Sequence, residues 1–154
     1  GTRNLMSKLY KMKKLASKRY RILAFVIDYL IFFTLFSVMC VFYGEPSEDG
    51  IGYQLNGNPA FILTLIGIFL WPFSEAYSGQ TIGKRLVGIK VVNENFREIK
   101  TSQAFIRFIF GLIDFSCLFV GLIVAYNNKN NQRIGDQIAK TIVIDINKTD
   151  AKIQ

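Results

Sequence analysis

Residues 22–43 read ILAFVIDYLIFFTLFSVMCVFY, an apolar stretch of 22 residues whose only charged member is Asp28. As an α-helix this stretch would rise about 33 Å, and the hydrocarbon core of a bilayer is about 30 Å thick. The stretch is too long for a signal peptide, and no cleavage site of the small-x-small kind follows it. Residues 22–43 therefore predict a transmembrane helix.

A second apolar stretch, at residues 59–77, predicts a helix that returns through the bilayer with a kink at Pro72. The loop between the two stretches, residues 44–58, has acidic residues but no lysine or arginine, whereas residues 79–103 hold several basic ones. Because cytoplasmic loops are enriched in Lys and Arg, we expect residues 79–103 and the N-terminus to lie in the cytoplasm. The protein is thus predicted to be a multi-pass protein of the cell membrane.

The net charge of +8 is concentrated near the N-terminus, where eight of the 19 basic residues precede Ile22. Basic residues beside an apolar stretch indicate a bilayer with anionic headgroups as the partner, and not nucleic acid. Residues 1–18 fit a basic amphipathic segment on the membrane surface, or a flank that only sets the topology. Residues 19–146 are the predicted membrane domain, and residues 147–154 are a polar tail.

The sequence has few of the groups that catalysis requires. It contains no histidine, which excludes Ser-His-Asp catalysis and histidine metal ligands. The two cysteines, Cys40 and Cys117, lie in apolar segments and form no CxxC motif. We therefore expect a protein that is not an enzyme and that has no cofactor and no metal site.

Residues 104–126 form a third apolar segment, for which two interpretations are open. Their length suits one straight transmembrane helix. Alternatively, two short helices broken near Ser116 would form a re-entrant hairpin, whose irregular backbone needs protein or water around it. The predicted fold is an α-helical integral membrane protein with two transmembrane helices plus a third span or re-entrant helical hairpin.

Two internal echoes favour the hairpin. The pattern Arg-x6-Asp occurs at residues 21–28 and again at residues 107–114. Residues 81–92, TIGKRLVGIKVV, align without gaps on residues 133–144, RIGDQIAKTIVI. These matches indicate a degenerate two-fold repeat, although chance similarity between apolar segments is the alternative.

Two runs rich in β-branched residues predict strands: LVGIKVV at residues 86–92 and TIVIDI at residues 141–146. A return strand at residues 97–101, REIKT, is a further candidate. Two strands can pair only if they lie on the same side of the membrane. Pairing of the two β-branched runs would therefore produce a small cytoplasmic β-patch and place the tail in the cytoplasm.

Taken together, these motifs resemble the RDD family of small bacterial membrane proteins, over about residues 19–145. The resemblance implies a place in the bacterial inner membrane. It also implies either sodium/proton exchange, which is reported for some members, or a role as an assembly module, and the fold does not choose between them. The residues that carry the resemblance are Arg21, Asp28, Glu75, Thr81, Gly83, Lys84, Arg107, Asp114, Arg133, Gly135 and Asp136.

The charges within the apolar segments are the candidate functional groups, since each buried Asp costs about 2.5–3.5 kcal/mol on insertion scales. In one hypothesis Asp28, Asp114 and Glu75 bind a cation or relay a proton, with Arg21 and Arg107 as countercharges. In the other, the same charges form a buried network that fixes helix register. Arginine and aspartate seven positions apart lie about 10 Å apart along a helix and cannot pair directly.

The motifs TIGK and RIGD are not phosphate-binding loops, because neither contains G-x-x-x-x-G-K-[ST]. We expect two short amphipathic elements to be anchored on the membrane by apolar side chains, with Lys84 and Arg85 near lipid phosphates. The anchoring residues are Ile82, Leu86, Ile134 and Ile138. The expected function is a transporter or an exchanger of monovalent cations and protons. The alternative is a non-catalytic scaffold that assembles other membrane proteins or copies of itself.

Overall fold

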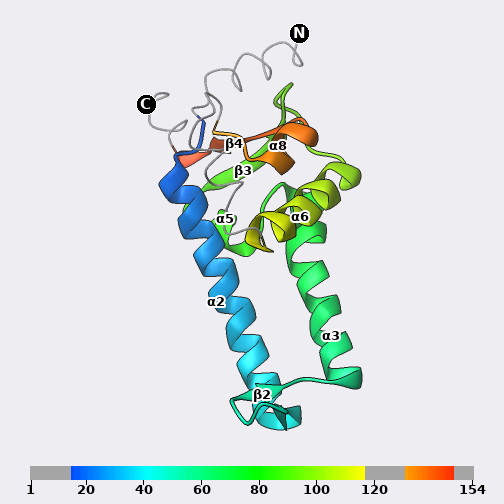
Figure 1. Cartoon of the computed structure of the whole chain (residues 1–154). Helices are drawn as coiled ribbons and strands as arrows, with labels where there is room; N and C mark the ends of the chain where they lie inside the picture. The colour runs from blue at the N-terminus through cyan, green and yellow to red at the C-terminus, as the bar shows by residue number, and fades with distance from the viewer. Residues whose placement is uncertain (1–14, 117–130, 148–154) are drawn as a thin grey trace.

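The structure, a computed structural model, describes residues 15–116 and 131–147, without the side chains of residues 114–116. Two long helical rods dominate it (Figure 1). The first rod is α2 (Lys18–Tyr43). The second rod consists of α3 (Gly57–Ile68), the π-helical turn η1 (Phe69–Phe73) and α4 (Ser74–Ser78).

Both rods have the length and surface of membrane spans. Their most apolar 18-residue windows have mean hydropathies of 2.3 and 1.5, and only 11% and 22% of those windows are buried within the protein. A core helix of a soluble protein would bury its apolar residues, whereas here large apolar side chains face outward along both rods. Two helices long and apolar enough to cross a membrane are therefore present where the sequence predicted them, and the first begins four residues earlier than its apolar run.

The second rod is irregular where the sequence predicted a kink. Pro72 has no backbone N–H and cannot join the regular hydrogen-bond ladder of an α-helix. The structure accommodates it in η1, a turn of wider hydrogen bonding that is frequent at functional sites. Residues 44–56 join the rods through the short antiparallel pair β1 (Glu45–Pro46) and β2 (Tyr53–Gln54).

The opposite end of the rods holds a small sheet made of β3 (Ile89–Asn93) and β4 (Thr141–Asp145), with a short helix before each strand (Figure 1). These helices are α5 (Ile82–Val87) and α8 (Ile134–Ile138). The two strands pair with each other, as the sequence predicted, and the structure shows that they are antiparallel. The return strand expected at residues 97–101 is wrong, because residues 98–100 are irregular and Thr101 begins a helix.

The third apolar segment begins with α6 (Thr101–Ser116), which lies at an angle to both rods near the sheet (Figure 1). It packs against η1, α4 and α8. The expected break near Ser116 and Cys117 lies at the edge of the described residues. The choice between a third span and a re-entrant hairpin therefore depends on residues 117–130, which lie outside the described residues.

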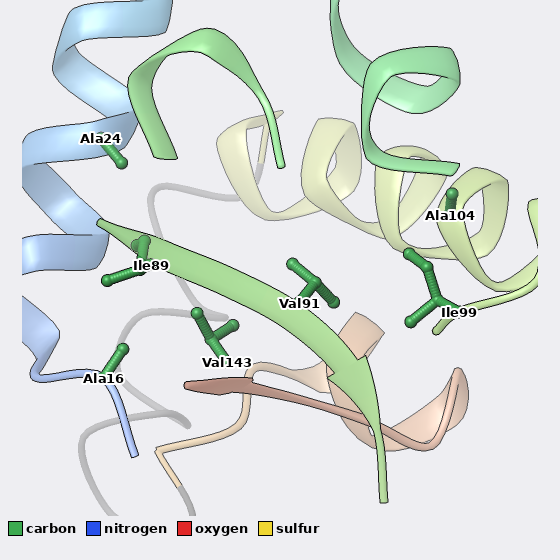
Figure 2. Close-up of a cluster of buried hydrophobic side chains, with 7 residues drawn as sticks. All are labelled: Ala16, Ala24, Ile89, Val91, Ile99, Ala104 and Val143. Atoms are coloured by element: carbon green, nitrogen blue, oxygen red, sulfur yellow. The ribbon is translucent and has the colours of Figure 1, made fainter. Parts of the chain in front are cut away.

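The hydrophobic core lies between the sheet and the helices that cover it. Figure 2 shows Ile89, Val91 and Val143 on the strands facing small residues of the neighbouring helices, among them Ala24 of α2 and Ala104 of α6. A second cluster covers the other face of the sheet. The residues just before α2 lie along the edge of the sheet, where the backbone N–H of Ala16 donates to the carbonyl of Val143 over 2.8 Å.

The backbone around the two echoed motifs repeats position by position. Gly79 and its counterpart Asn131 both have left-handed φ, of 70° and 52°. Gly88 and its counterpart Lys140 do as well, with φ of 78° and 53°. The side-chain amides of Gln80 and Gln132 donate to the carbonyls of Ile89 and Thr141 over 2.9 and 2.8 Å, and these pairs are again equivalent.

The packing of the motifs repeats too. A Cβ on Gly83 would lie 2.1 Å from the carbonyl oxygen of Ala24, and one on Gly135 would lie 2.8 Å from Cβ of Phe110. Ala24 and Phe110 each stand three positions after the arginine of an Arg-x6-Asp pattern. The strand register pairs Val91 with its own counterpart Val143, as a two-fold axis requires. The predicted two-fold repeat is therefore present in the structure.

Candidate functional site

A cavity of about 370 Å³ lies between the two repeats, where α2, the second rod, α6 and the two motifs meet. One part of its lining is charged and the other is mostly aromatic. The charged lining residues are Arg21, Asp28, Glu75, Lys84, Arg107, Arg133 and Asp136. The apolar lining includes Phe25, Tyr29, Phe32, Trp71, Phe108 and Leu112.

Five of the charged side chains form a continuous chain of ion pairs. Lys84 pairs with Glu75, and Glu75 accepts from Nε of Arg107 over 2.5 Å. The NH1 group of Arg107 pairs with Asp136, which in turn pairs with Arg21. The side chains of all five are at most 18% exposed. Buried charges of alternating sign stabilise one another, so this chain of ion pairs holds α2, α4, α6 and α8 together.

The repeat explains the order of charges in this chain. Arg21 of the first repeat meets Asp136 of the second. The equivalent contact would bring Arg107 to Lys84, which has the same charge. Glu75 of α4 lies between them and pairs with both. One acidic side chain thus replaces a repulsion by two attractions, which is why an acidic residue is needed at the end of the second rod.

Asp28 is held differently, because its partners among the described residues are neutral donors. Its carboxylate accepts from Oγ1 of Thr81 over 2.5 Å and from the backbone N–H of Gly83 over 2.7 Å. It is 9% exposed and makes no ion pair with any described residue. Gly83 is required here because only a residue without a side chain lets the backbone of α5 approach Ala24 so closely.

The structure brings only part of the expected carboxylate cluster together. Asp28 and Glu75 line the same cavity, whereas the side chain of Asp114 lies outside the described residues. In the described part of the chain, no three acidic or sulfur-containing side chains converge as a metal site would need. Of the expected countercharges, Arg107 pairs with Glu75, one of the three candidate carboxylates, and both Arg21 and Arg107 pair with Asp136.

The expectation for Lys84 is wrong, because its ammonium group pairs with Glu75 beside the cavity instead of extending toward lipid phosphates. The exposed positions of the two motif helices include apolar residues, with Leu86 of α5 70% exposed and Ile138 of α8 51% exposed. Arg133 and Gly135 of the second motif line the cavity. The motifs therefore build the site itself.

Asp136 is the central residue that sequence reasoning placed only in a motif. Burial by itself would raise the pKa of its carboxyl, but the charges of Arg107 and Arg21 hold this pKa well below its usual range. The carboxylate also accepts from the backbone N–H of Arg133 over 3.1 Å. Burial lowers the pKa of Lys84, and the charge of Glu75 opposes that shift only in part. The sequence did contain a signal for the importance of Asp136, because Asp136 is the counterpart of Lys84 in the aligned motifs.

Two apolar rods, a capping sheet and a buried charged cavity between repeats define a helical membrane protein. A comparison with known families matched residues 15–140 to the RDD family. Because the match covers most of the chain, this protein belongs to the RDD family. Comparisons with curated proteins and with solved structures gave no match.

Proposed function

We propose that this protein is a proton-coupled membrane transporter, in which the cavity holds the transported solute and Asp28 carries the proton. The observation behind the proposal is the contrast among the cavity's carboxylates. Glu75 and Asp136 are each neutralised by two cations, whereas the only described groups that bind Asp28 are a hydroxyl and a backbone N–H. A carboxylate without a cationic partner can gain and lose a proton without breaking an ion pair.

The position of the cavity supports the same function. Secondary transporters often consist of repeats with the substrate site at the repeat interface, since the repeats can then rock around a fixed site. Here both repeats contribute lining residues, among them Arg21 and Thr81 from the first and Arg107 and Gly135 from the second. The π-helical turn with Pro72 also lines the cavity and interrupts the second rod at that level.

The test is proton movement in proteoliposomes that contain a pH-sensitive dye. Wild-type protein should move protons when a gradient of the coupled solute is applied, and Asp28→Asn should abolish this movement while the protein stays folded. Glu98→Gln is the matched control, because Glu98 is 86% exposed and lies outside the cavity. Sodium and potassium gradients show whether a monovalent cation is exchanged. Full activity of Asp28→Asn would remove Asp28 from the mechanism.

A scaffold that assembles other membrane proteins is the second candidate, and the ion-pair chain favours it. Five charges that satisfy one another fix the helices in one arrangement, which suits a rigid assembly surface. Wild-type protein that moves no protons under any solute or cation gradient would support the scaffold over the transporter.

A further inference from the structure

The lengths of the two rods indicate the depth at which the short helix α5 lies in a bilayer. From Ala24 to Tyr43, α2 rises about 29 Å. From Gly57 to Tyr77, the second rod rises about 30 Å. The hydrocarbon core is about 30 Å thick, so a bilayer that begins at the acidic β1–β2 loop ends at the level of Ala24 and Tyr77.

The helix α5 packs against α2 at this level (Figure 1). Its Gly83 lies so close to α2 that a Cβ there would be 2.1 Å from the carbonyl oxygen of Ala24. The exposed side chains of α5 are those of Ile82, Arg85 and Leu86. Residues three and four positions apart share one face of a helix. This face therefore presents a cation between two apolar side chains, the pattern of a helix that lies at the boundary between hydrocarbon and headgroups.

The guanidinium group of Arg85 is available to a partner outside the chain. It makes no ion pair with any described residue, whereas Lys84 beside it pairs with Glu75. A guanidinium group matches a phosphate with two parallel hydrogen bonds, and headgroup phosphates are the anions present at this depth. The apolar stem of an arginine can lie along acyl chains while its charged end reaches the headgroups.

We propose that the exposed face of α5 binds an anionic phospholipid, with the phosphodiester on Arg85 and the acyl chains against Ile82 and Leu86. The phosphate of a zwitterionic lipid is compensated by the lipid's own ammonium group, so an anionic lipid should be preferred. One basic residue near an anionic membrane surface corresponds to a preference of about fivefold. This binding goes beyond the proposed function, because it requires neither transport nor assembly of other proteins.

Brominated lipids, which quench tryptophan fluorescence on contact, test the site on the full-length protein in nanodiscs. The chain has one tryptophan, so Leu86→Trp in a Trp71→Phe background places the only fluorophore on α5. Brominated phosphatidylglycerol should quench it with about fivefold higher apparent affinity than brominated phosphatidylcholine. Adding Arg85→Gln should remove this preference. Equal quenching by the two lipids, or a preference that survives Arg85→Gln, would overturn the proposal.

Arg97→Gln is the control with the same change of charge. Arg97 is exposed and follows β3, whose five residues extend about 16 Å away from α5. This distance exceeds the Debye length of about 10 Å in ordinary buffers, so Arg97→Gln should keep the preference. An equal loss of the preference in Arg97→Gln and Arg85→Gln would mean that net charge selects the lipid, and would overturn a site on α5.

Native mass spectrometry provides a second measurement that keeps Trp71 and Leu86. Wild-type protein taken from detergent with an equal mixture of the two lipids should retain phosphatidylglycerol in preference to phosphatidylcholine, and Arg85→Gln should retain both equally. Arg85 is exposed, so its replacement should leave the unfolding temperature unchanged. A folded Arg85→Gln protein with the wild-type preference would overturn the proposal. Selective binding in a protein that moves no protons would refute the proposed function and leave this inference intact.

Discussion

At the scale of single residues, the site contains two kinds of buried carboxylate. Glu75 and Asp136 lie between cations, and Asp136 pairs with an arginine 115 positions earlier in the sequence. Asp28 accepts two hydrogen bonds from uncharged groups. Removal of the negative charge should therefore have different consequences at the two kinds of position.

Glu75→Gln should strongly destabilise the protein, because it leaves Lys84 and Arg107 facing each other without the intervening negative charge. Breaking a buried ion pair typically costs about 3–5 kcal/mol. Thermal unfolding in detergent measures the effect, with Glu98→Gln as the control, since Glu98 only reaches Lys90 at 3.9 Å on the surface. A Glu75→Gln protein as stable as wild type would contradict the ion-pair chain.

Asp28→Asn should lower the unfolding temperature much less than Glu75→Gln does. The amide oxygen can still accept from the backbone N–H of Gly83, and no cation is left without a partner. A neutral amide is also cheaper to bury than a carboxylate. If Asp28→Asn were the more damaging of the two substitutions, Asp28 would have a structural role that the observed contacts do not explain.

The pH dependence of stability should reveal the contribution of the Asp136 carboxylate. Its pKa in the folded protein is lowered, so its carboxylate contributes stability that is fully present above the unfolded value of about 3.9 and is lost as pH falls toward the folded value. The difference in unfolding temperature between wild type and Asp136→Asn should thus be constant between pH 5 and pH 7 on this account and shrink below about pH 4. A difference that grows in acid would be inconsistent with the lowered pKa.

At the scale of secondary-structure elements, the two motif units differ at their helix ends. Gly88 ends α5 with left-handed φ, and Lys140 has the same conformation at the equivalent place after α8. A non-glycine residue in this region costs about 1–2 kcal/mol, and glycine itself loses about 0.5–1 kcal/mol in chain entropy. The second unit therefore holds a strain that the first avoids.

Lys140→Gly should stabilise the protein by about 0.5–1 kcal/mol, the difference between those two contributions. Gly88→Ala should destabilise it, because the backbone is strained and the new Cβ would lie 2.1 Å from Nδ2 of Asn147. Chemical denaturation of both variants in detergent measures the two changes. Destabilisation by Lys140→Gly would mean that the lysine side chain makes contacts worth more than the strain.

At the scale of the whole molecule, the rods place the β1–β2 loop at one end and the sheet at the other (Figure 1). The sheet end includes residues from both halves of the chain, since β3 pairs with β4 and Leu15 bridges to Ile144. If both rods cross the bilayer, these segments share one side. The positive-inside rule predicts that this side is the cytoplasm.

Labelling single cysteines from outside intact cells tests this topology. In a background with Cys40→Ala and Cys117→Ala, Asp49→Cys in the β1–β2 loop should react with an impermeant maleimide, and Asn147→Cys after β4 should not. Permeabilised cells are the control, in which both positions should react. Labelling of both positions in intact cells would contradict a shared cytoplasmic side for the sheet.

The features determined by the sequence alone are local or repetitive ones. Two long apolar runs predict two membrane-length helices, because the bilayer thickness sets the length of an apolar helix. The pairing of β3 with β4 and the two-fold repeat were predictable from runs of β-branched residues and from the aligned Ile-Gly motifs. The family was predictable as well, since its motifs are stretches of consecutive residues.

Only the tertiary structure decided which charges meet. Arg21 and Asp136 are 115 positions apart, and the geometry of a single helix says only that Arg21 cannot reach Asp28. The inward position of Lys84, the role of Glu75 between two cations and the angle of α6 follow from packing between elements. A long-range contact depends on where several helices pack at once, and the pattern of residues along any one of them does not contain that information.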